Sequence, residues 1–152
     1  MWCFKSPIGW LGVQVDDGRL VDIEFIRAVT STPQRPSTLE WNIEQQLTEY
    51  FRHNKTSFNL PLSPAGSVFQ QRVWSALQDI PYGQVRTYGQ IARALNSSPR
   101  AVGNACRANP IPVIIPCHRV VAARGIGGYA GKTDGPVLAR KRWLLTHEGV
   151  AL

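Results

Sequence analysis

Two short helices joined by a polar turn are predicted by the stretch TYGQIARALNSSPRAVGNACRA, residues 87–108. Thr87 and Gln90 have the spacing of a capping box, in which each side chain accepts a hydrogen bond from the other residue's backbone N–H. Ser98 caps the second helix, and Pro99 fills its first position, where the missing N–H costs least. Paired helices of this kind are typical of a helix-turn-helix, a DNA-binding arrangement, but many helical hairpins bind nothing.

The second helix of this pair combines two arginines, Arg100 and Arg107, with a face of small residues. The small residues are Ala101, Gly103, Ala105 and Ala108. Such a face lets a backbone approach closely, and it serves either a bound ligand or tight packing against a neighbouring helix. Both interpretations stay open at this point.

The chain before this pair begins with a small α/β pattern. Residues 8–15 and 20–26 are rich in apolar or alternating side chains, which predicts two strands, and Asp16-Asp17-Gly18 between them predicts a hairpin turn. Ser37 then opens a helix with a second capping box, and apolar residues recur at helical spacing until the polar run that starts at Arg52. Strand, strand and helix together indicate a small α/β lobe.

A Pro-rich stretch around residues 60–66 separates this lobe from the rest, so we place two domains at 1–62 and 63–152. The second domain is expected to open with a helix that has one apolar stripe and ends before Pro81. The stripe consists of Val68, Phe69, Val73, Trp74 and Leu77.

Composition limits the class of protein further. A chain of 152 residues and 16.9 kDa has the size of one domain or of two small lobes. With 43% hydrophobic residues it can bury a core, which excludes disorder, collagen and coiled coil for the chain as a whole. Its apolar runs fall short of the roughly 18 residues of a membrane span, and its start does not resemble a signal peptide. We therefore expect a cytoplasmic protein with no membrane partner.

The net charge points to an anionic partner. A formal charge of +7 and an isoelectric point near 9.8 favour nucleic acid above all. The excess of Lys and Arg lies in the second domain, where the only acidic residues are Asp79, Asp134 and Glu148. A basic enzyme without a nucleic-acid partner is the other interpretation.

Three cysteines, Cys3, Cys106 and Cys117, are present without C-x-x-C spacing, which excludes a disulfide framework and a zinc finger. Cys117 lies in the sharpest motif of the chain, IIPCHRVV at residues 114–121. Because prolines precede it closely, we expect an extended, rigid segment on which Cys117 and His118 point to opposite sides. A lone cysteine is more often a buried hydrophobe than a nucleophile, so the residue type alone favours packing.

This motif resembles the active-site signature of the O6-alkylguanine-DNA alkyltransferases, also called methylated-DNA–protein-cysteine methyltransferases. The matching residues are Pro116-Cys117-His118-Arg119-Val120. Further family motifs follow the same order from Ser67 to the end of the chain: FQQRVW at 69–74, IPYG at 80–83, TYGQIA at 87–92, RAVG at 100–103, NP at 109–110, GGYAG at 127–131 and WLLTHEG at 143–149. Before Ser67 the resemblance thins to SPIG at 6–9 and the order of strands and helix.

The resemblance implies the chemistry of the site. Cys117 would attack the alkyl carbon of an O6-alkylguanine and keep the alkyl group as a stable thioether, so that each molecule reacts once. An ether carbon is a poor electrophile, and a free thiol with a pKa of about 8.5 is mostly protonated at neutral pH. The family passes the thiol proton through a water to the next histidine, here His118, which a glutamate, here Glu148, orients. Asn109 corresponds to the residue that ties the helix-turn-helix to the active-site segment.

The resemblance also implies how DNA carrying the lesion is bound. The family lays its second helix in the minor groove of double-stranded DNA and flips the target nucleotide out of the stack. Arg100 would fill the vacated stack, Tyr88 would help to push the nucleotide out, and Arg107 would lie near phosphates. The flipped base would contact Val120, Tyr129 and Ala130. Core packing is the other interpretation of the two tyrosines.

The chain departs from the familiar pattern at three places. Ala130 stands where many relatives have a serine, and Cys106 stands where a methionine often lines the base site. Residues 132–136 make the loop after the GGYAG motif longer than in familiar members. Some relatives bind zinc in the first lobe, but this lobe has only Cys3 and His53 as typical ligands, so we expect no metal.

We therefore expect an α/β protein with a small RNase H-like N-terminal lobe followed by a winged helix-turn-helix C-terminal lobe, both named from the resemblance. The expected function is direct-reversal repair of O6-methylguanine, and also of O4-methylthymine, by a monomer without a cofactor. Two alternatives are a module that recognises alkyl lesions without removing them, as the alkyltransferase-like proteins do, and a cysteine–histidine hydrolase. The alkyltransferase-like proteins replace the cysteine, which is present here as Cys117. A hydrolase would not explain why the helix pair is basic.

Overall fold

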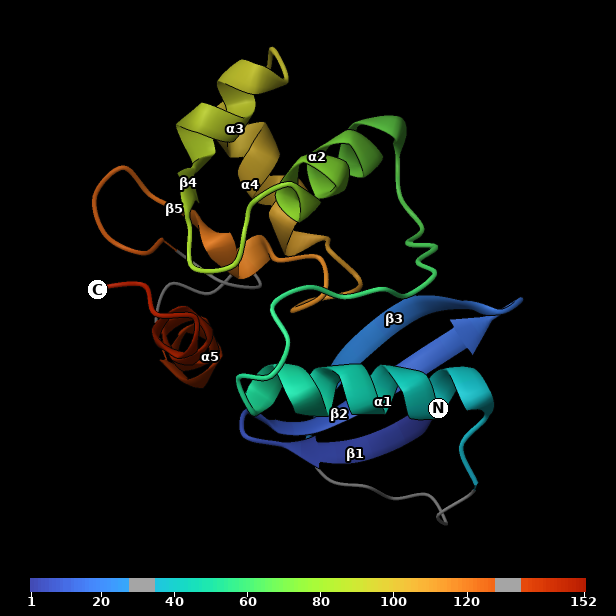
Figure 1. The fold of residues 1–152 in the computed structure, drawn as a ribbon. Helices are drawn as coiled ribbons and strands as arrows, with labels where there is room; N and C mark the ends of the chain where they lie inside the picture. The colour runs from blue at the N-terminus through green and yellow to red at the C-terminus, as the bar shows by residue number, and fades with distance from the viewer. Residues whose placement is uncertain (28–34, 128–134) are drawn as a thin grey trace. The chain divides into compact units, whose positions relative to one another are not determined.

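The computed structural model describes residues 1–27, 35–127 and 135–152 (Figure 1). These residues divide into two compact units, Met1–Ala65 and Gly66–Leu152. Each unit combines helices with strands, so the mixed α/β class expected from the sequence is confirmed.

The first unit has a three-stranded antiparallel sheet with one helix packed against it (Figure 1). Its strands, in sheet order, are β1 (Trp2–Ser6), β2 (Gly9–Asp16) and β3 (Arg19–Ile26). Asp17 and Gly18 connect β2 to β3 with φ angles of 49° and 72°, the left-handed geometry of a two-residue hairpin turn. The predicted hairpin is confirmed, whereas the sequence pattern did not predict β1.

Helix α1 (Thr38–Phe51) begins at its predicted cap. Ser37 Oγ accepts from Glu40 N at 3.1 Å, and Glu40 Oε1 accepts from Ser37 N at 2.8 Å, which completes the capping box. The core of this unit consists of buried residues from the helix and the sheet: Phe4, Leu11, Val13, Leu20, Ile23, Ile43, Leu47 and Tyr50.

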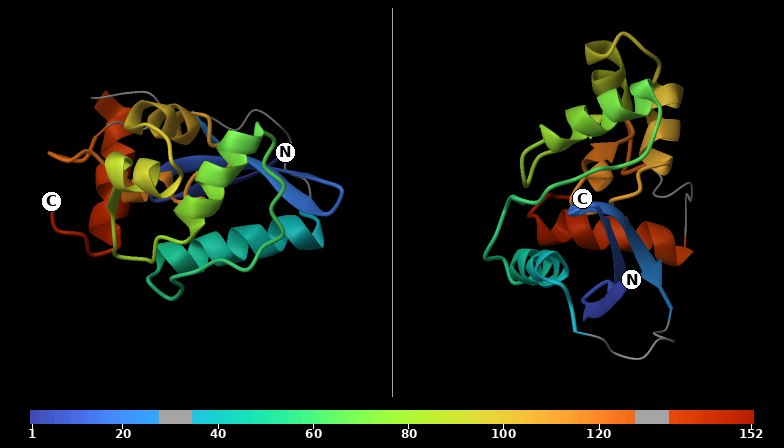
Figure 2. Two further views of the ribbon diagram at one scale, coloured as in Figure 1. Left: turned by 90° about the horizontal axis from the view of Figure 1, so that it is seen from above. Right: turned by 90° about the vertical axis from the view of Figure 1, so that its right-hand side faces the viewer.

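The second unit contains most of the helices. They are α2 (Val68–Gln78), α3 (Tyr88–Ala94), α4 (Pro99–Arg107) and α5 (Gly135–His147). Helix α4 packs against both α2 and α3 (Figures 1 and 2). A short 3₁₀ turn, η1 (Cys117–Arg119), leads into β5 (Val120–Val121), which pairs in parallel with β4 (Arg86–Thr87).

Helix α2 buries only part of its predicted stripe. Val73, Trp74 and Leu77 are buried, but Val68 is 80% exposed. Val68 lies five residues before Val73. At about 100° per residue, the two side chains point in directions that differ by about 140° around the helix axis. The assignment of Val68 to the buried stripe is therefore wrong.

The predicted helix pair is confirmed as α3 and α4. Gln90 N donates to Thr87 Oγ1 at 3.0 Å, and Ala101 N donates to Ser98 Oγ at 3.1 Å, so both helices begin at their predicted caps. The carbonyl of Ala105 accepts from Trp74 Nε1 of α2 at 2.8 Å. Part of the small-residue face of α4 thus serves tight packing within the unit.

Candidate active site

Cys117 begins the 3₁₀ turn η1 and does not lie on an extended segment. Arg119 N donates to the Pro116 carbonyl at 3.0 Å, and Val120 N donates to the Cys117 carbonyl. A proline lacks only its own backbone N–H, and the N–H groups that close this turn belong to Arg119 and Val120. The nearby prolines therefore do not prevent the turn. The prediction of an extended segment is therefore wrong, and Cys117, His118 and Arg119 are all buried instead of alternating between two sides.

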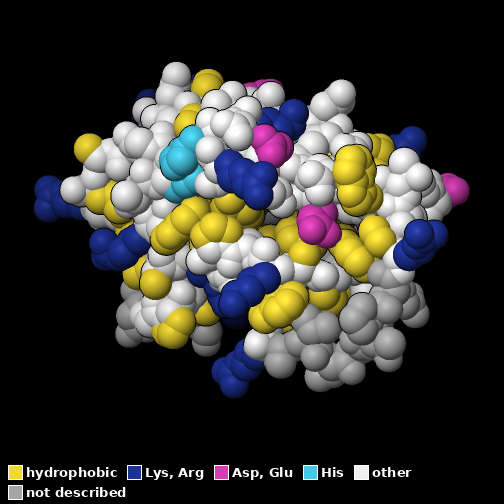
Figure 3. Space-filling model, turned by 60° about the horizontal axis from the view of Figure 1, so that its bottom comes forward, with side chains coloured by type: hydrophobic (Ala, Val, Ile, Leu, Met, Phe, Trp, Pro, Cys, Tyr) yellow, Lys and Arg dark blue, Asp and Glu magenta, His cyan; other side chains and the backbone are white. Residues whose placement is uncertain are grey.

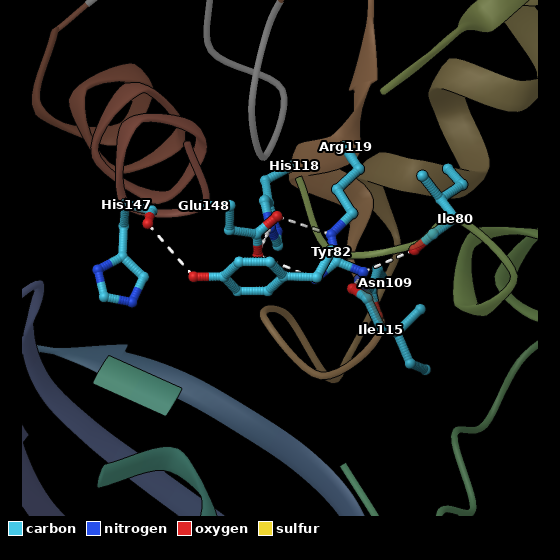
Figure 4. Close-up of polar contacts among 8 residues, drawn as sticks. All are labelled: Ile80, Tyr82, Asn109, Ile115, His118, Arg119, His147 and Glu148. Atoms are coloured by element: carbon cyan, nitrogen blue, oxygen red, sulfur yellow. Dashed lines mark hydrogen bonds and ion pairs between the residues drawn. The ribbon is translucent and has the colours of Figure 1, made fainter. Parts of the chain in front are cut away.

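Asn109 links the end of α4 to the loop that precedes Cys117. Its Nδ2 donates to the Ile115 carbonyl at 2.8 Å (Figure 4). Its Oδ1 accepts from Ile111 N at 2.9 Å. Within this loop Val113 has a φ of 71°, which is strained for a β-branched residue. The two bonds of one amide therefore hold a strained loop in place just before the cysteine.

A buried charged cluster follows the cysteine, formed by His118, Arg119 and Glu148 (Figure 4). Arg119 Nε donates to Glu148 Oε1 at 2.8 Å, and Arg119 Nη2 donates to Glu148 Oε2 at 2.9 Å. Arg119 Nη1 donates to the Ile80 carbonyl at 2.7 Å. His118 Nε2 lies 2.9 Å from Glu148 Oε2. The structure thus brings His118 and Glu148 together and adds an arginine to them.

This cluster determines the tautomer of His118. Glu148 receives two hydrogen bonds from a guanidinium, so it is ionised, and an ionised carboxylate only accepts. His118 Nε2 therefore carries the hydrogen of its contact with Glu148, and Nδ1 is the acceptor of the neutral ring. Nδ1 is buried and has no hydrogen-bond partner within the described part of the chain.

The surroundings of His118 favour its neutral ring. Burial lowers its pKa, because an imidazolium loses its hydration inside the protein. The hydrogen bond and charge of Glu148 act in the opposite direction, while the positive charges of Arg119 and Lys141 add to the lowering. The net change is downward from the usual value of 6.5.

Lys141 is a further buried charge near the cysteine. Its side chain comes from α5, and its Nζ donates to the Val120 carbonyl at 2.7 Å. Burial lowers the pKa of Lys141 to about 8, and interaction with Cys117 opposes this change. The sequence does carry a signal for it, because Lys141 lies three residues after Leu138 and four before Leu145, on the buried stripe of the helix.

Tyr88 and Cys106, both expected at the base site, lie in the same electrostatic environment. Burial raises the pKa of Tyr88 to about 12 and that of Cys106 to about 12, and the charge of Cys117 contributes to both changes. Cys106 therefore stays protonated at neutral pH. The Tyr88 ring lies 5.7 Å from Lys141 Nζ, and a Cβ at Gly127 would lie 3.1 Å from that ring. Tyr88 is thus packed on one side and partly exposed on another.

The remaining predicted contacts have different positions. Arg100 and Arg107 are exposed on α4, and Val120 is buried with its carbonyl bonded to Lys141. Tyr129 and Ala130 lie outside the described residues. On the face drawn in Figure 3, Lys and Arg side chains stand singly among hydrophobic and polar ones, so charge alone does not mark a binding surface there.

Known proteins share both the sequence and the fold. A family model described as the DNA-binding domain of 6-O-methylguanine DNA methyltransferase matches residues 68–150. A methylated-DNA–protein-cysteine methyltransferase of Methanosarcina acetivorans is 39% identical over 96% of either chain, and one of Archaeoglobus fulgidus is 44% identical over 93% of either chain. The chain belongs to the methylated-DNA–protein-cysteine methyltransferase family. Mycobacterium tuberculosis OGT, in its crystal structure with DNA, is 37% identical, with a TM-score of 0.82 over 97% of this chain and 92% of that one.

For this member of the methyltransferase family, sequence reasoning missed two buried groups. Arg119 belongs to the signature but received no role, and Lys141 was not singled out. Within residues 1–27, 35–127 and 135–152, no three His, Cys, Asp or Glu side chains are grouped to hold a metal ion. No helix in those ranges is both long and apolar enough to cross a membrane.

Proposed function

We propose that this methyltransferase repairs DNA by direct reversal, moving a methyl or other alkyl group from O6 of guanine to Cys117. One observation carries the proposal: the residue after Cys117 is a buried imidazole whose Nδ1 has no hydrogen-bond partner in the described part of the chain and whose Nε2 lies 2.9 Å from Glu148 Oε2. The names of the relatives support the same activity. O4-methylthymine is the second proposed substrate.

The reaction starts with removal of the thiol proton. Cys117 passes its proton through a water to Nδ1 of His118, and Glu148 keeps the ring in the accepting tautomer. The thiolate then attacks the alkyl carbon in line with its bond to O6, so a C–S bond forms and the C–O bond breaks. The electron pair of the broken bond stays on the guanine, which takes up a proton. This balance requires no cofactor or metal.

The protein is consumed by this reaction. The product on Cys117 is a thioether, which has no leaving group at neutral pH. A second turnover would need a nucleophile to displace carbon from sulfur, and the chain offers none that is better than the thiolate it has lost. Each molecule therefore removes one alkyl group.

DNA recognition is assigned to α3 and α4. We propose that α4 enters the minor groove of double-stranded DNA, which is narrow, so the small residues of this helix favour the approach. Arg100 then fills the stack that the flipped base has left, Tyr88 pushes the nucleotide outward, and Arg107 binds phosphate. The exposure of both arginines supports this assignment.

The flipped base is assigned to the pocket around Cys117. The carbonyls of Cys117 and Val120 accept from the guanine amine, Tyr129 forms one wall, and the Ala130 amide faces O6. Lys141 occupies one lone pair of the Val120 carbonyl, and a carbonyl oxygen has a second one for the base.

The domain assignment completes the proposal. Residues 1–62 form an RNase H-like lobe and residues 63–152 a winged helix-turn-helix lobe, and the protein acts as a monomer. Its place is the cytoplasm, because the acceptor must remain a reduced thiol. A module that recognises lesions without removing them is not favoured, since Cys117 is present and the relatives are named as methyltransferases.

Mass spectrometry after incubation with duplex DNA that carries one O6-methylguanine tests the proposal. We expect the intact protein to gain one methyl group, located on the peptide that contains Cys117. Cys117→Ser should abolish the gain and keep DNA affinity, because a serine alkoxide is inaccessible near neutral pH. Cys106→Ser is the matched control and should still react. A methyl group on Cys106, or transfer by Cys117→Ser, would contradict the assignment.

A further inference from the structure

Arg119 has no role in the proposed proton relay, although it is buried together with His118 and Glu148. Its guanidinium donates to both oxygens of Glu148 and to the Ile80 carbonyl, and its Cζ lies 5.8 Å from the centre of the Tyr82 ring. Tyr82 Oη in turn donates to the His147 carbonyl at 3.3 Å (Figure 4). An arginine that is fixed at this many points holds the carboxylate of Glu148 in one orientation.

The charge of Arg119 matters for His118 because both contact the same carboxylate oxygen. Glu148 Oε2 accepts from Arg119 Nη2 at 2.9 Å and lies 2.9 Å from His118 Nε2. A buried carboxylate facing an imidazole alone would favour the imidazolium, which has no lone pair to accept a further proton. With Arg119 present, the carboxylate is part of a bidentate ion pair without net charge.

We propose that Arg119 is a positioning residue for proton transfer: it neutralises Glu148 and so keeps His118 a neutral imidazole whose Nδ1 can accept the thiol proton. The destination of that proton rests on the proposed function. The protonation state of His118 is a property of the protein alone, and it can be measured without DNA.

Other charged groups near His118 act alongside Arg119. Lys141 on α5 disfavours protonation of the ring through its charge, Glu148 follows the same helix and favours it, and Cys117 precedes the ring on η1. Burial is the largest cause of the lowered pKa of His118. Of the two cations, Arg119 is the one that donates to Glu148 itself, at 2.8 and 2.9 Å, so its removal is expected to release the full attraction of that carboxylate.

An NMR titration of protein labelled with ¹⁵N-histidine tests the protonation claim. The chain has three histidines, so the imidazole signals can be assigned by substituting His53 and His147. Arg119→Gln keeps a donor to Glu148 but removes the charge, and the midpoint of His118 should rise by about one pH unit or more. Arg119→Lys keeps the charge and serves as the matched control, with a midpoint close to that of the unmodified protein. An unchanged midpoint in folded Arg119→Gln would overturn the proposal.

Single-turnover transfer measured against pH gives a second readout. Arg119→Gln should lose activity at neutral pH and regain it as the pH rises, because His118 then becomes neutral again. A purely structural defect would lower the rate equally at every pH, and that result would also overturn the proposal. If the unmodified protein transferred no methyl group, the proposed function would fail while the NMR result still decided the role of Arg119.

A double variant keeps the proposal testable if Arg119→Gln does not fold. Glu148→Gln alone leaves the charge of Arg119 without its buried partner, which makes His118 a weaker proton acceptor. Adding Arg119→Gln removes that charge, so the double variant should transfer faster than Glu148→Gln, by about tenfold for each pH unit that the His118 midpoint recovers. A double variant that is equally slow or slower would overturn the proposal.

Discussion

The charged cluster of His118, Arg119 and Glu148 is buried, whereas Arg100 and Arg107 stand exposed on α4 of the same unit. In the cluster, each charge is fixed by hydrogen bonds inside the protein, and removing one partner leaves another charge buried without compensation. On α4, the arginines remain hydrated, so their loss costs the free protein little. The comparison separates residues whose change alters the protein itself from residues whose change should leave the free protein intact and, under the proposed function, alter only its complex with DNA.

Glu148→Gln is the substitution with the largest expected effect. It removes the anion that both His118 and Arg119 contact, so methyl transfer should slow by about 10²–10³-fold, within the range of general acid–base contributions. The free energy of unfolding should fall by about 3 kcal/mol, because Arg119 remains buried without its partner. Single-turnover kinetics and urea unfolding measure the two effects, and the affinity for DNA should stay within about twofold.

A matched control is Glu49→Gln, since Glu49 is a half-exposed glutamate whose Oε1 lies 3.6 Å from Arg52 Nη1 on the surface of α1. This surface pair should contribute less than about 1 kcal/mol and should leave transfer unchanged. Equal effects of the two substitutions on transfer would break the comparison between the buried cluster and the surface.

The same contrast explains what the sequence could predict. Ser37, Thr87 and Ser98 were identified as caps, because a cap depends on residues three positions apart. The pair of Arg119 and Glu148 joins residues 29 positions apart, and no periodic pattern specifies such a contact. The Cys117 turn was missed because prolines restrict their own positions, while its closing bonds come from residues after them.

The candidate site was predictable only through the resemblance. Residue types alone favoured packing for Cys117 and offered no reason to connect His118 with Glu148. The family signature supplied both residues, and the structure brings their side chains to within 2.9 Å of each other. Lys141 could have been found from its place on an apolar stripe, but a lysine there is usually read as a break in the stripe.

Lys141→Met tests whether a buried charge makes the stability of the protein depend on pH. The pKa of Lys141 falls from its usual 10.5 to about 8 on burial, so the folded protein binds fewer protons than the unfolded chain between these values. The stability of the unmodified protein relative to Lys141→Met should therefore rise between pH 8 and 10.5, by up to about 3 kcal/mol. Urea unfolding at several pH values measures this difference.

The exposed Lys5 offers the control for this prediction. Lys5→Met removes the same kind of charge from the surface, and its free energy of unfolding is to be measured at the same pH values. If the free energies of unfolding of Lys141→Met and the unmodified protein changed in parallel with pH, Lys141 would be hydrated and would not belong with the buried charges.

Arg100→Ala tests the exposed side, and its effect should depend on the substrate. If Arg100 fills the stack left by a flipped base, its loss costs most where the base is held in a pair. Transfer should slow by about tenfold or more on duplex DNA, less on single-stranded DNA, and scarcely with a free alkylguanine base. The unfolding free energy should stay within about 0.5 kcal/mol of the unmodified value. Equal slowing on all three substrates would mean that Arg100 supports the pocket or the fold.

Arg107→Ala should have the smallest effect, and it isolates the electrostatic part of binding. Arg107 lies in the last turn of α4 and is exposed, so we assign it a phosphate contact, which is independent of the lesion and of base flipping. Its loss should weaken binding to methylated and unmethylated DNA by the same factor, about three- to tenfold, and reduce the salt slope by about one unit or less. Transfer at saturating DNA should not change, because no group of the buried cluster has moved. Arg19→Ala, at an exposed arginine of β3, is the control and should leave the salt slope unchanged. A slower rate at saturation for Arg107→Ala would mean that α4 takes part in the chemical step, and the two regions would then not be separable.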